Sequence, residues 1–144
     1  MIDSQTLCKP LQQGDQVDIV ASSFYIDNEK SLTDGLQVLL EWGLEPRKKN
    51  ITWRRWGYLA GEDSIRYAEL HSETASPLKI FVRGGWGAAR LLELGQPWRK
   101  GWLLGFSDVS SLLLSRLSFG FDGNIHGPLL TTLSNEPEWS KERL

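Results

Sequence analysis

Three short apolar segments, each followed by small or polar residues and then by a stretch with helical spacing, constrain the fold of this chain most. They lie at residues 17–21, 78–82 and 102–106. Strands that alternate with helices in this way build a parallel sheet with helices on both faces, so the pattern predicts an α/β fold. We expect the functional site in the loops at the carboxyl ends of the strands. These loops are residues 22–23, 83–87 and 107–108.

Helical spacing fills the intervals between these strands. Helices are predicted over residues 29–42, 62–75 and 88–94, and from 107 to about 119. Asp27 or Asn28 can cap the first helix, and Gly43 lies where a left-handed residue would end it. A further short strand is predicted over residues 124–126.

The chain has 144 residues, which allows one domain with a sizeable core. Residues 1–13 lack periodicity and are predicted to form an N-terminal arm. Residues 14–130 contain the predicted strands and helices and form the domain. Residues 131–144 turn polar and are expected to add little to the core.

Composition excludes several classes of function. Lys+Arg 16 against Asp+Glu 18 gives a net charge of -2, so no basic field attracts nucleic acid or a membrane surface. The single cysteine, Cys8, excludes an internal disulfide and a thiolate metal cluster, and only two histidines argue against a metal site. No signal peptide or membrane-spanning segment is visible, so we expect a cytoplasmic protein.

Ser107 is the sharpest candidate for chemistry. The segment Gly105-Phe106-Ser107-Asp108 places a serine directly between a predicted buried strand and a helix. Such an elbow presents the hydroxyl at the top of the sheet, next to free amides that can stabilise the oxyanion of acyl transfer. The alternative is that Ser107 or Asp108 caps the helix. The G-x-S-x-G pattern of hydrolases is incomplete, because Val109 replaces the last glycine.

The second candidate is Arg83-Gly84-Gly85-Trp86-Gly87, which follows another predicted strand. Its three glycines let backbone amides approach a ligand closely. The loop can supply an oxyanion donor, bind an anionic ligand, or form a plain tight turn. Nucleotide binding has weak support, because the loop lacks the third glycine of a dinucleotide fingerprint and the lysine of a P-loop.

A serine nucleophile needs a base, usually a histidine oriented by a carboxylate. His71 falls in the second predicted helix near Glu69 and Glu73, and we expect it to be exposed to solvent. His126 ends the last predicted strand and could reach the site, although a structural role is favoured. The sequence shows no convincing base for Ser107.

Aromatic residues are frequent around the predicted site. Trp53 and Trp56 flank two arginines in a loop. Trp86 lies in the segment of residues 83–87, which we call the glycine segment. Aromatic and basic residues together can stack on nucleic acid, but the negative net charge argues against that use.

Several short blocks occur in the order found in a known family. The blocks are residues 14–23, 57–61, 83–87 with 89–92, 105–108 and 126–128. They resemble those of the LD-carboxypeptidases, serine peptidases that include the murein tetrapeptide carboxypeptidases and the microcin C7 self-immunity peptidases. Each block is weak alone, but the ordered set is specific.

The resemblance implies a flavodoxin-like fold, similar to the class I glutamine amidotransferases, in which Ser107 is the nucleophile. It also implies an oxyanion hole formed by the backbone amides of Gly85 and Asp108. The residues expected on the substrate side of the glycine segment are Gly84, Trp86 and Gly87. The family releases the terminal D-alanine of murein tetrapeptides during cytoplasmic wall recycling, without metal or cofactor. Trp86 replaces a usual tyrosine, which removes no reacting group.

The resemblance covers only the N-terminal domain of a two-domain family. The family's triad glutamate and histidine come from the C-terminal domain, which would explain the missing base. Our hypothesis is therefore an N-terminal fragment, a frame-disrupted gene product or one half of a split enzyme, with little activity alone. The expected partners are a murein peptide substrate and either a second copy of the chain or a complementary C-terminal half.

A different class of function stays open as the alternative. A non-catalytic flavodoxin-like module would bind a peptide or an anionic ligand at residues 84–87. Replacing Ser107 would leave such binding unchanged, whereas it would abolish hydrolysis.

Overall fold

The computed structural model describes residues 8–47, 51 and 54–144, and its centre is a five-stranded sheet. The strands are β1 (Gln16–Val20), β2 (Glu45–Pro46), β3 (Leu78–Phe81), β4 (Trp102–Gly105) and β5 (Asn124–His126). They pair in the order β2-β1-β3-β4-β5, and every pair is parallel. This is the strand order of flavodoxin-like folds, so the predicted fold class is confirmed.

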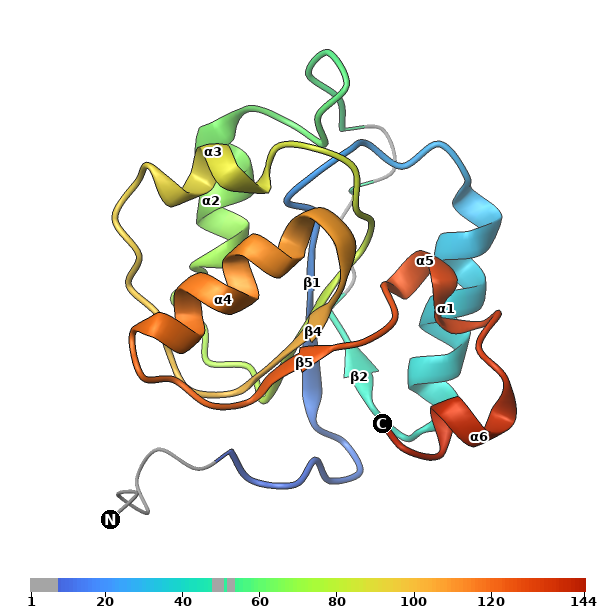
Figure 1. Cartoon of the computed structure of the whole chain (residues 1–144). Helices are drawn as coiled ribbons and strands as arrows, with labels where there is room; N and C mark the ends of the chain where they lie inside the picture. Colours follow the sequence, from blue (N-terminus) through green and yellow to red (C-terminus); the bar gives the residue numbers. More distant parts are fainter. Residues whose placement is uncertain (1–7, 48–50, 52–53) are drawn as a thin grey trace.

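Helices cover both faces of the sheet (Figure 1). On one face lie α2 (Asp63–Leu70), α3 (Ala88–Leu92) and α4 (Ser110–Ser118), the last preceded by a 3-10 turn, η1 (Ser107–Val109). On the other lie α1 (Glu29–Glu41), α5 (Leu130–Leu133) and α6 (Glu138–Lys141). None of the helices in the described part combines the length and the apolar character needed to cross a bilayer.

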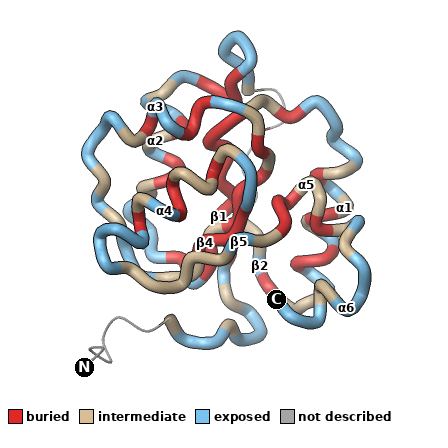
Figure 2. Tube along the Cα trace, in the orientation of Figure 1, coloured by how far each residue is buried: buried red, intermediate tan, exposed pale blue. Residues whose placement is uncertain are grey.

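Strand side chains alternate between two apolar cores, one on each face of the sheet. On β1, Val17 and Ile19 pack on the α1 side, whereas Val20 packs on the α4 side. On β4, Leu104 packs on the α1 side and Leu103 packs on the α4 side. The buried residues therefore gather along the strands and on the helix faces turned toward them (Figure 2).

The first helix forms where the sequence predicts it. Asn28, and not Asp27, is the N-cap: its side-chain oxygen accepts a hydrogen bond from the Ser31 amide at 3.1 Å. Gly43 has a φ of +77°, so it ends the helix in the left-handed conformation that the sequence analysis assigned to it.

The second helix ends at Leu70, so the prediction that it continues to Ala75 is wrong. The Ser72 hydroxyl donates to Oδ2 of Asp18 on β1, and the Ser76 hydroxyl donates to a β1 carbonyl oxygen. These bonds hold the segment after α2 against the sheet and take it off the helical path.

The sequence pattern misses β2, α5 and α6, and it underestimates the end of the chain. α5 spans the expected boundary at residue 130 and buries Leu133 completely. The expectation that residues 131–144 add little to the core is therefore wrong at Leu133. A Cβ atom at Gly35 of α1 would lie 1.9 Å from the carbonyl oxygen of Leu130, so α5 packs this closely only because position 35 is glycine.

Candidate active site

The three loops predicted to carry the site meet at the carboxyl edge of the sheet. The amide of Phe24, just after β1, donates to the carbonyl oxygen of Gly84 at 3.3 Å. The Ser23 hydroxyl donates to Oδ2 of Asp108 at 2.7 Å. The site therefore lies where the strand order changes direction, between β1 and β3, which is the usual ligand position in such sheets.

Ser107 adopts a left-handed backbone conformation. Its φ is +66°, and within the described ranges it is the one non-glycine residue with a positive φ. It lies directly between β4 and the turn η1, and it is exposed at the edge of the sheet. A strained, exposed serine at a strand-to-helix turn has the geometry of a nucleophile elbow.

The turn at Ser107 requires glycine at positions 84 and 105, because a side chain at either position would collide with its neighbours. A Cβ atom at Gly84 would lie 2.9 Å from Cβ and 3.0 Å from Oγ of Ser107. A Cβ atom at Gly105 would lie 2.8 Å from Cγ2 of Val109 and 2.9 Å from the Phe81 ring. Glycine at both positions lets the chain turn sharply after β4 and pass directly beside the segment at residues 84–87.

Asp108 links the three loops instead of capping its own helix. Its Oδ2 accepts hydrogen bonds from the Ser23 hydroxyl and, at 2.9 Å, from the amide of Ala88, the first residue of α3. Neither η1 nor α4 has a side-chain cap. The alternative that Ser107 or Asp108 caps this helix is therefore wrong, because the Asp108 carboxylate is drawn to α3.

The amides expected to form the oxyanion hole have no competing acceptor. In the part of the chain that the structure describes, the N–H groups of Gly85 and Asp108 donate no hydrogen bond. Gly85 has a φ of +113°, and a Cβ atom there would lie 2.5 Å from the Phe24 ring. Only glycine fits this place, and its amide has no acceptor among the described residues. The oxyanion hole itself stays a prediction.

Arg66, which the sequence analysis does not single out, is fully buried beneath this edge. Nε donates to the carbonyl oxygen of Gly61 at 3.0 Å, while Nη1 donates to those of Ser22 and, at 3.0 Å, Gly87. Nη2 pairs with Asp63. A sequence signal existed, since Arg66 shares the helical spacing of the buried face of α2.

Burial lowers the pKa of the Arg66 guanidinium from its usual value, and the ion pair with Asp63 opposes that shift. Asp63 also accepts hydrogen bonds from Arg90 of α3, at 2.6 Å from Nη2. The Arg90 guanidinium holds the pKa of the Asp63 carboxyl below its ordinary value, so Asp63 stays ionised between the two arginines.

Neither histidine is hydrogen-bonded to Ser107 within the described residues. The His71 ring lies between those of Tyr67 and Trp98, with centroid distances of 4.8 Å and tilts of 55° and 58°. It is half-buried, so the expectation of a ring open to solvent is wrong. Burial lowers its pKa from the ordinary value. His126 is exposed at the end of β5, with its ring centroid 6.2 Å from that of Phe106.

Trp86 is the most exposed part of the glycine segment, with 71% of its surface accessible. Trp56 and Tyr58 are also exposed, and the Arg90 guanidinium lies 5.8 Å from the centroid of the Trp56 ring. Trp53 lies outside the described residues. Exposed aromatic side chains thus lie beside the candidate site.

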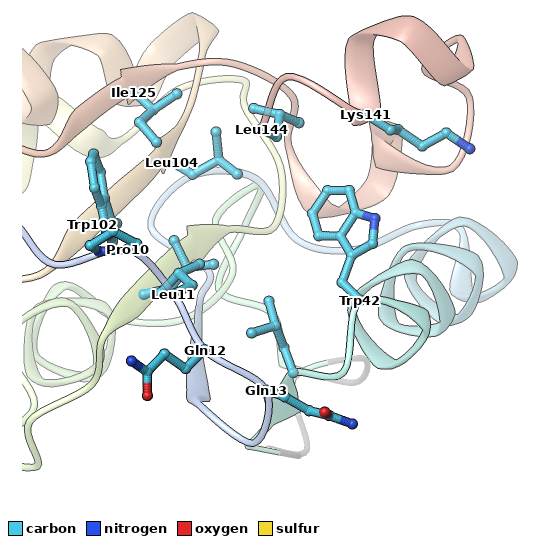
Figure 3. Close-up of a pocket in the computed structure, with 12 residues that line it drawn as sticks. Pro10, Leu11, Gln12, Gln13, Trp42, Trp102, Leu104, Ile125, Lys141 and Leu144 are labelled. Carbon is cyan, nitrogen blue, oxygen red and sulfur yellow. The ribbon is translucent and has the colours of Figure 1, made fainter.

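Three cavities in the described part of the chain lie away from this edge. A cavity of about 590 Å³ lies on the α1 face of the sheet, between the N-terminal arm and the end of the chain (Figure 3). Its apolar lining includes Leu11, Trp42, Trp102 and Leu144. Ser107 and residues 83–87 line none of these three cavities.

Comparison with known proteins agrees with this geometry. The family described as the LD-carboxypeptidase N-terminal domain matches residues 17–127. The Synechocystis sp. protein named "Putative carboxypeptidase slr1534" is 41% identical over an alignment of 144 positions, which covers 94% of this chain and 46% of that protein. The chain therefore spans less than half the length of this relative.

Solved structures share the fold. MccF in complex with glutamyl sulfamoyl guanosine matches with a TM-score of 0.81 at 19% identity, over 95% of this chain and 44% of that one. A muramoyltetrapeptide carboxypeptidase from Oxalobacter formigenes matches with a TM-score of 0.65 at 21% identity, over 80% of this chain and 40% of that one. Because the family match spans most of the chain, including the elbow and the glycine segment, the chain belongs to the LD-carboxypeptidase family and contains its N-terminal domain.

Proposed function

We propose that this chain provides the nucleophile domain of a serine LD-carboxypeptidase. The proposed enzyme releases the terminal D-alanine from murein tetrapeptides during cytoplasmic cell-wall recycling. The observation that carries the proposal is the left-handed φ of Ser107 in a sharp elbow against Gly84. Strained conformations of this kind persist only where the surrounding structure enforces them, and they cluster at active sites.

The names of related proteins support the same reaction class. The Synechocystis relative is named as a carboxypeptidase, and the Oxalobacter structure is that of a muramoyltetrapeptide carboxypeptidase. One MccF structure is an active-site mutant in which a serine, an asparagine and a lysine are each replaced by alanine. An active-site serine in a protein of the same fold agrees with Ser107 as the nucleophile.

In the proposed reaction, Oγ of Ser107 attacks the carbonyl carbon of the scissile amide while a base takes its proton. The carbonyl oxygen becomes an oxyanion that accepts hydrogen bonds from the Gly85 and Asp108 amides. Collapse of this intermediate expels D-alanine, whose amine receives the proton from the base. Water then hydrolyses the acyl-serine and restores the hydroxyl of Ser107.

The base is the part of this mechanism that the described residues do not supply. The resemblance to the family assigns the triad histidine and glutamate to a C-terminal domain, and His126 is the one histidine of this chain near the edge of the sheet. Without a base, amide donors and substrate binding alone retain on the order of 10³–10⁴-fold catalysis over water. We therefore expect the 144-residue chain to be nearly inactive by itself.

The alternative of a non-catalytic module that binds a peptide or an anion at residues 84–87 leaves the Ser107 conformation unexplained. Ligand binding by backbone amides requires the glycines but no strained serine beside them. The hydrolase proposal accounts for both features.

The test is covalent labelling of the chain by a fluorophosphonate, read by intact mass and by peptide mapping, together with D-alanine release from L-Ala-D-Glu-mesoDap-D-Ala. Because the base is missing, we expect D-alanine release close to background and slow labelling of Ser107 at high fluorophosphonate concentration, supported by the amides beside it. The Ser107→Ala variant should take no label. Labelling should be unchanged in Ser118→Ala, which removes an exposed serine at the end of α4. Equal labelling of the Ser107→Ala variant would overturn the proposal.

A further inference from the structure

Arg66 contacts three loops at once, and two of them belong to the candidate site. Its guanidinium donates to the carbonyl oxygen of Ser22, which follows β1, and of Gly61, which precedes α2. It also donates to that of Gly87, at the end of the glycine segment. A guanidinium is a planar group with five N–H donors in fixed directions, so these bonds set the loops relative to one another.

The glycine segment is pressed against this guanidinium. A Cβ atom at Gly87 would lie 3.1 Å from Nη1 of Arg66 and 2.4 Å from a methyl carbon of Leu59. Gly87 also has a φ of +121°. Gly87 therefore packs directly against the Arg66 guanidinium, and the position of Gly87 depends on the position of that side chain.

The other end of the same segment touches the nucleophile. Gly84 packs against Cβ and Oγ of Ser107, and Gly85 lies between Gly84 and the part of the segment that Arg66 holds. A shift of Gly87 toward or away from α2 thus moves the Gly85 amide relative to Ser107.

We infer that Arg66 is a positioning residue for the reaction, one that holds the glycine segment so that the Gly85 amide meets the oxyanion formed at Ser107. The inference rests on the proposed function. Arg66 touches no reacting atom, and it acts through the carbonyl oxygen of Gly87.

The arrangement explains why a charged side chain is buried here. Removing a guanidinium from water is costly unless hydrogen bonds and an opposite charge replace the lost hydration. Arg66 has all of its surface covered, with three carbonyl acceptors and the carboxylate of Asp63 as replacement. Lysine would keep the charge but lacks the planar fork that reaches all these acceptors.

The chain offers a matched control in Arg116 of α4. It is almost fully buried and also donates to backbone carbonyl oxygens, those of Arg99, Gly101 and Asp122. These acceptors lie at the amino edge of the sheet, away from the elbow. Arg116→Lys therefore removes a comparable buried network without touching the glycine segment.

The experiment compares Arg66→Lys and Arg116→Lys with the unmodified chain at a temperature where all three are folded. Backbone amide spectra locate the change: Arg66→Lys should shift the signals of residues 84–88, and Arg116→Lys should leave them in place. The rate of fluorophosphonate addition to Ser107 should fall by roughly 10-fold or more in Arg66→Lys, because misplacing a preorganised donor by about 1 Å costs up to 10²-fold. The fluorophosphonate concentration that gives half the maximal labelling rate should differ by no more than about 2-fold between Arg66→Lys and the unmodified chain. Arg116→Lys should be labelled at the same rate as the unmodified chain.

The outcomes separate the two proposals. If the signals of residues 84–88 stay unchanged in Arg66→Lys, or if Arg116→Lys slows labelling equally, the positioning role is wrong. If the unmodified chain is not labelled at Ser107, the proposed function fails, and the amide spectra still decide whether Arg66 places the Gly85 amide.

Discussion

The Ser23 hydroxyl donates a hydrogen bond of 2.7 Å to Oδ2 of Asp108, across 85 residues of sequence. Ser23 follows β1 and Asp108 follows β4, and β3 lies between these strands in the sheet. The bond thus spans the glycine segment that follows β3, and the same carboxylate oxygen accepts from Ala88 at the end of that segment. The Asp108 side chain therefore joins the elbow at Ser107 to both neighbouring loops.

Replacing both partners of this bond should reveal their coupling. We expect Ser23→Ala to lower the free energy of unfolding by about 1 kcal/mol, and Asp108→Ala to lower it further because Ala88 also loses its acceptor. A double-mutant cycle by urea denaturation should give a coupling of roughly 1 kcal/mol. Purely additive effects would show that the bond does not form in solution.

The strain at Ser107 predicts an unusual order of stabilities. Glycine adopts a φ of +66° without steric cost, whereas alanine keeps the strain of serine. We expect Ser107→Gly to be more stable than Ser107→Ala by about 1–2 kcal/mol, although both lack the Ser107 hydroxyl. Chemical denaturation of the two variants measures the difference, and equal stabilities would contradict the left-handed elbow.

Gly84 should tolerate no side chain. A Cβ atom there collides with Ser107, so Gly84→Ala is expected to displace the elbow, reduce fluorophosphonate labelling and destabilise the fold by about 1–3 kcal/mol. Gly95→Ala is the control, because its nearest neighbour, the Tyr67 hydroxyl, would lie 3.9 Å away. That variant should stay within about 0.5 kcal/mol of the unmodified chain. Normal labelling of Gly84→Ala would refute the close approach.

His71 should make stability depend on pH. Burial between Tyr67 and Trp98 lowers its pKa, so the unfolded chain binds a proton more readily than the folded one. Stability from this group is present above the unfolded pKa and is lost as pH falls through the folded pKa. Melting temperatures measured from pH 7.5 to about pH 5 should therefore fall less in His71→Phe than in the unmodified chain. Parallel curves for the two proteins would show that His71 is not buried in this way.

Much of the fold could be predicted because it depends on local patterns. The apolar runs that become β1, β3 and β4 have side chains on both faces of the sheet that need burial. A sheet with helices on both faces provides this burial, and such sheets are mostly parallel. By contrast, β2 has only two residues and no apolar run, so its sequence gives no sign of a strand. It becomes a strand because it pairs with β1. The burial of Leu133 could likewise not be predicted, because the surrounding sequence is polar. Leu133 is buried by packing against α1.

The sequence by itself determined where the candidate site lies: a serine after β4 and a glycine segment after β3, both at the carboxyl edge. Only the tertiary structure decided what the polar side chains there contact. Asp108 reaches the Ser23 hydroxyl and α3 instead of capping α4, and Arg66 reaches Ser22 across 44 residues. The physical reason is that local sequence sets which residues prefer burial and which backbone conformations are accessible. A buried polar group must find its hydrogen-bond partners among whatever segments the packing brings next to it.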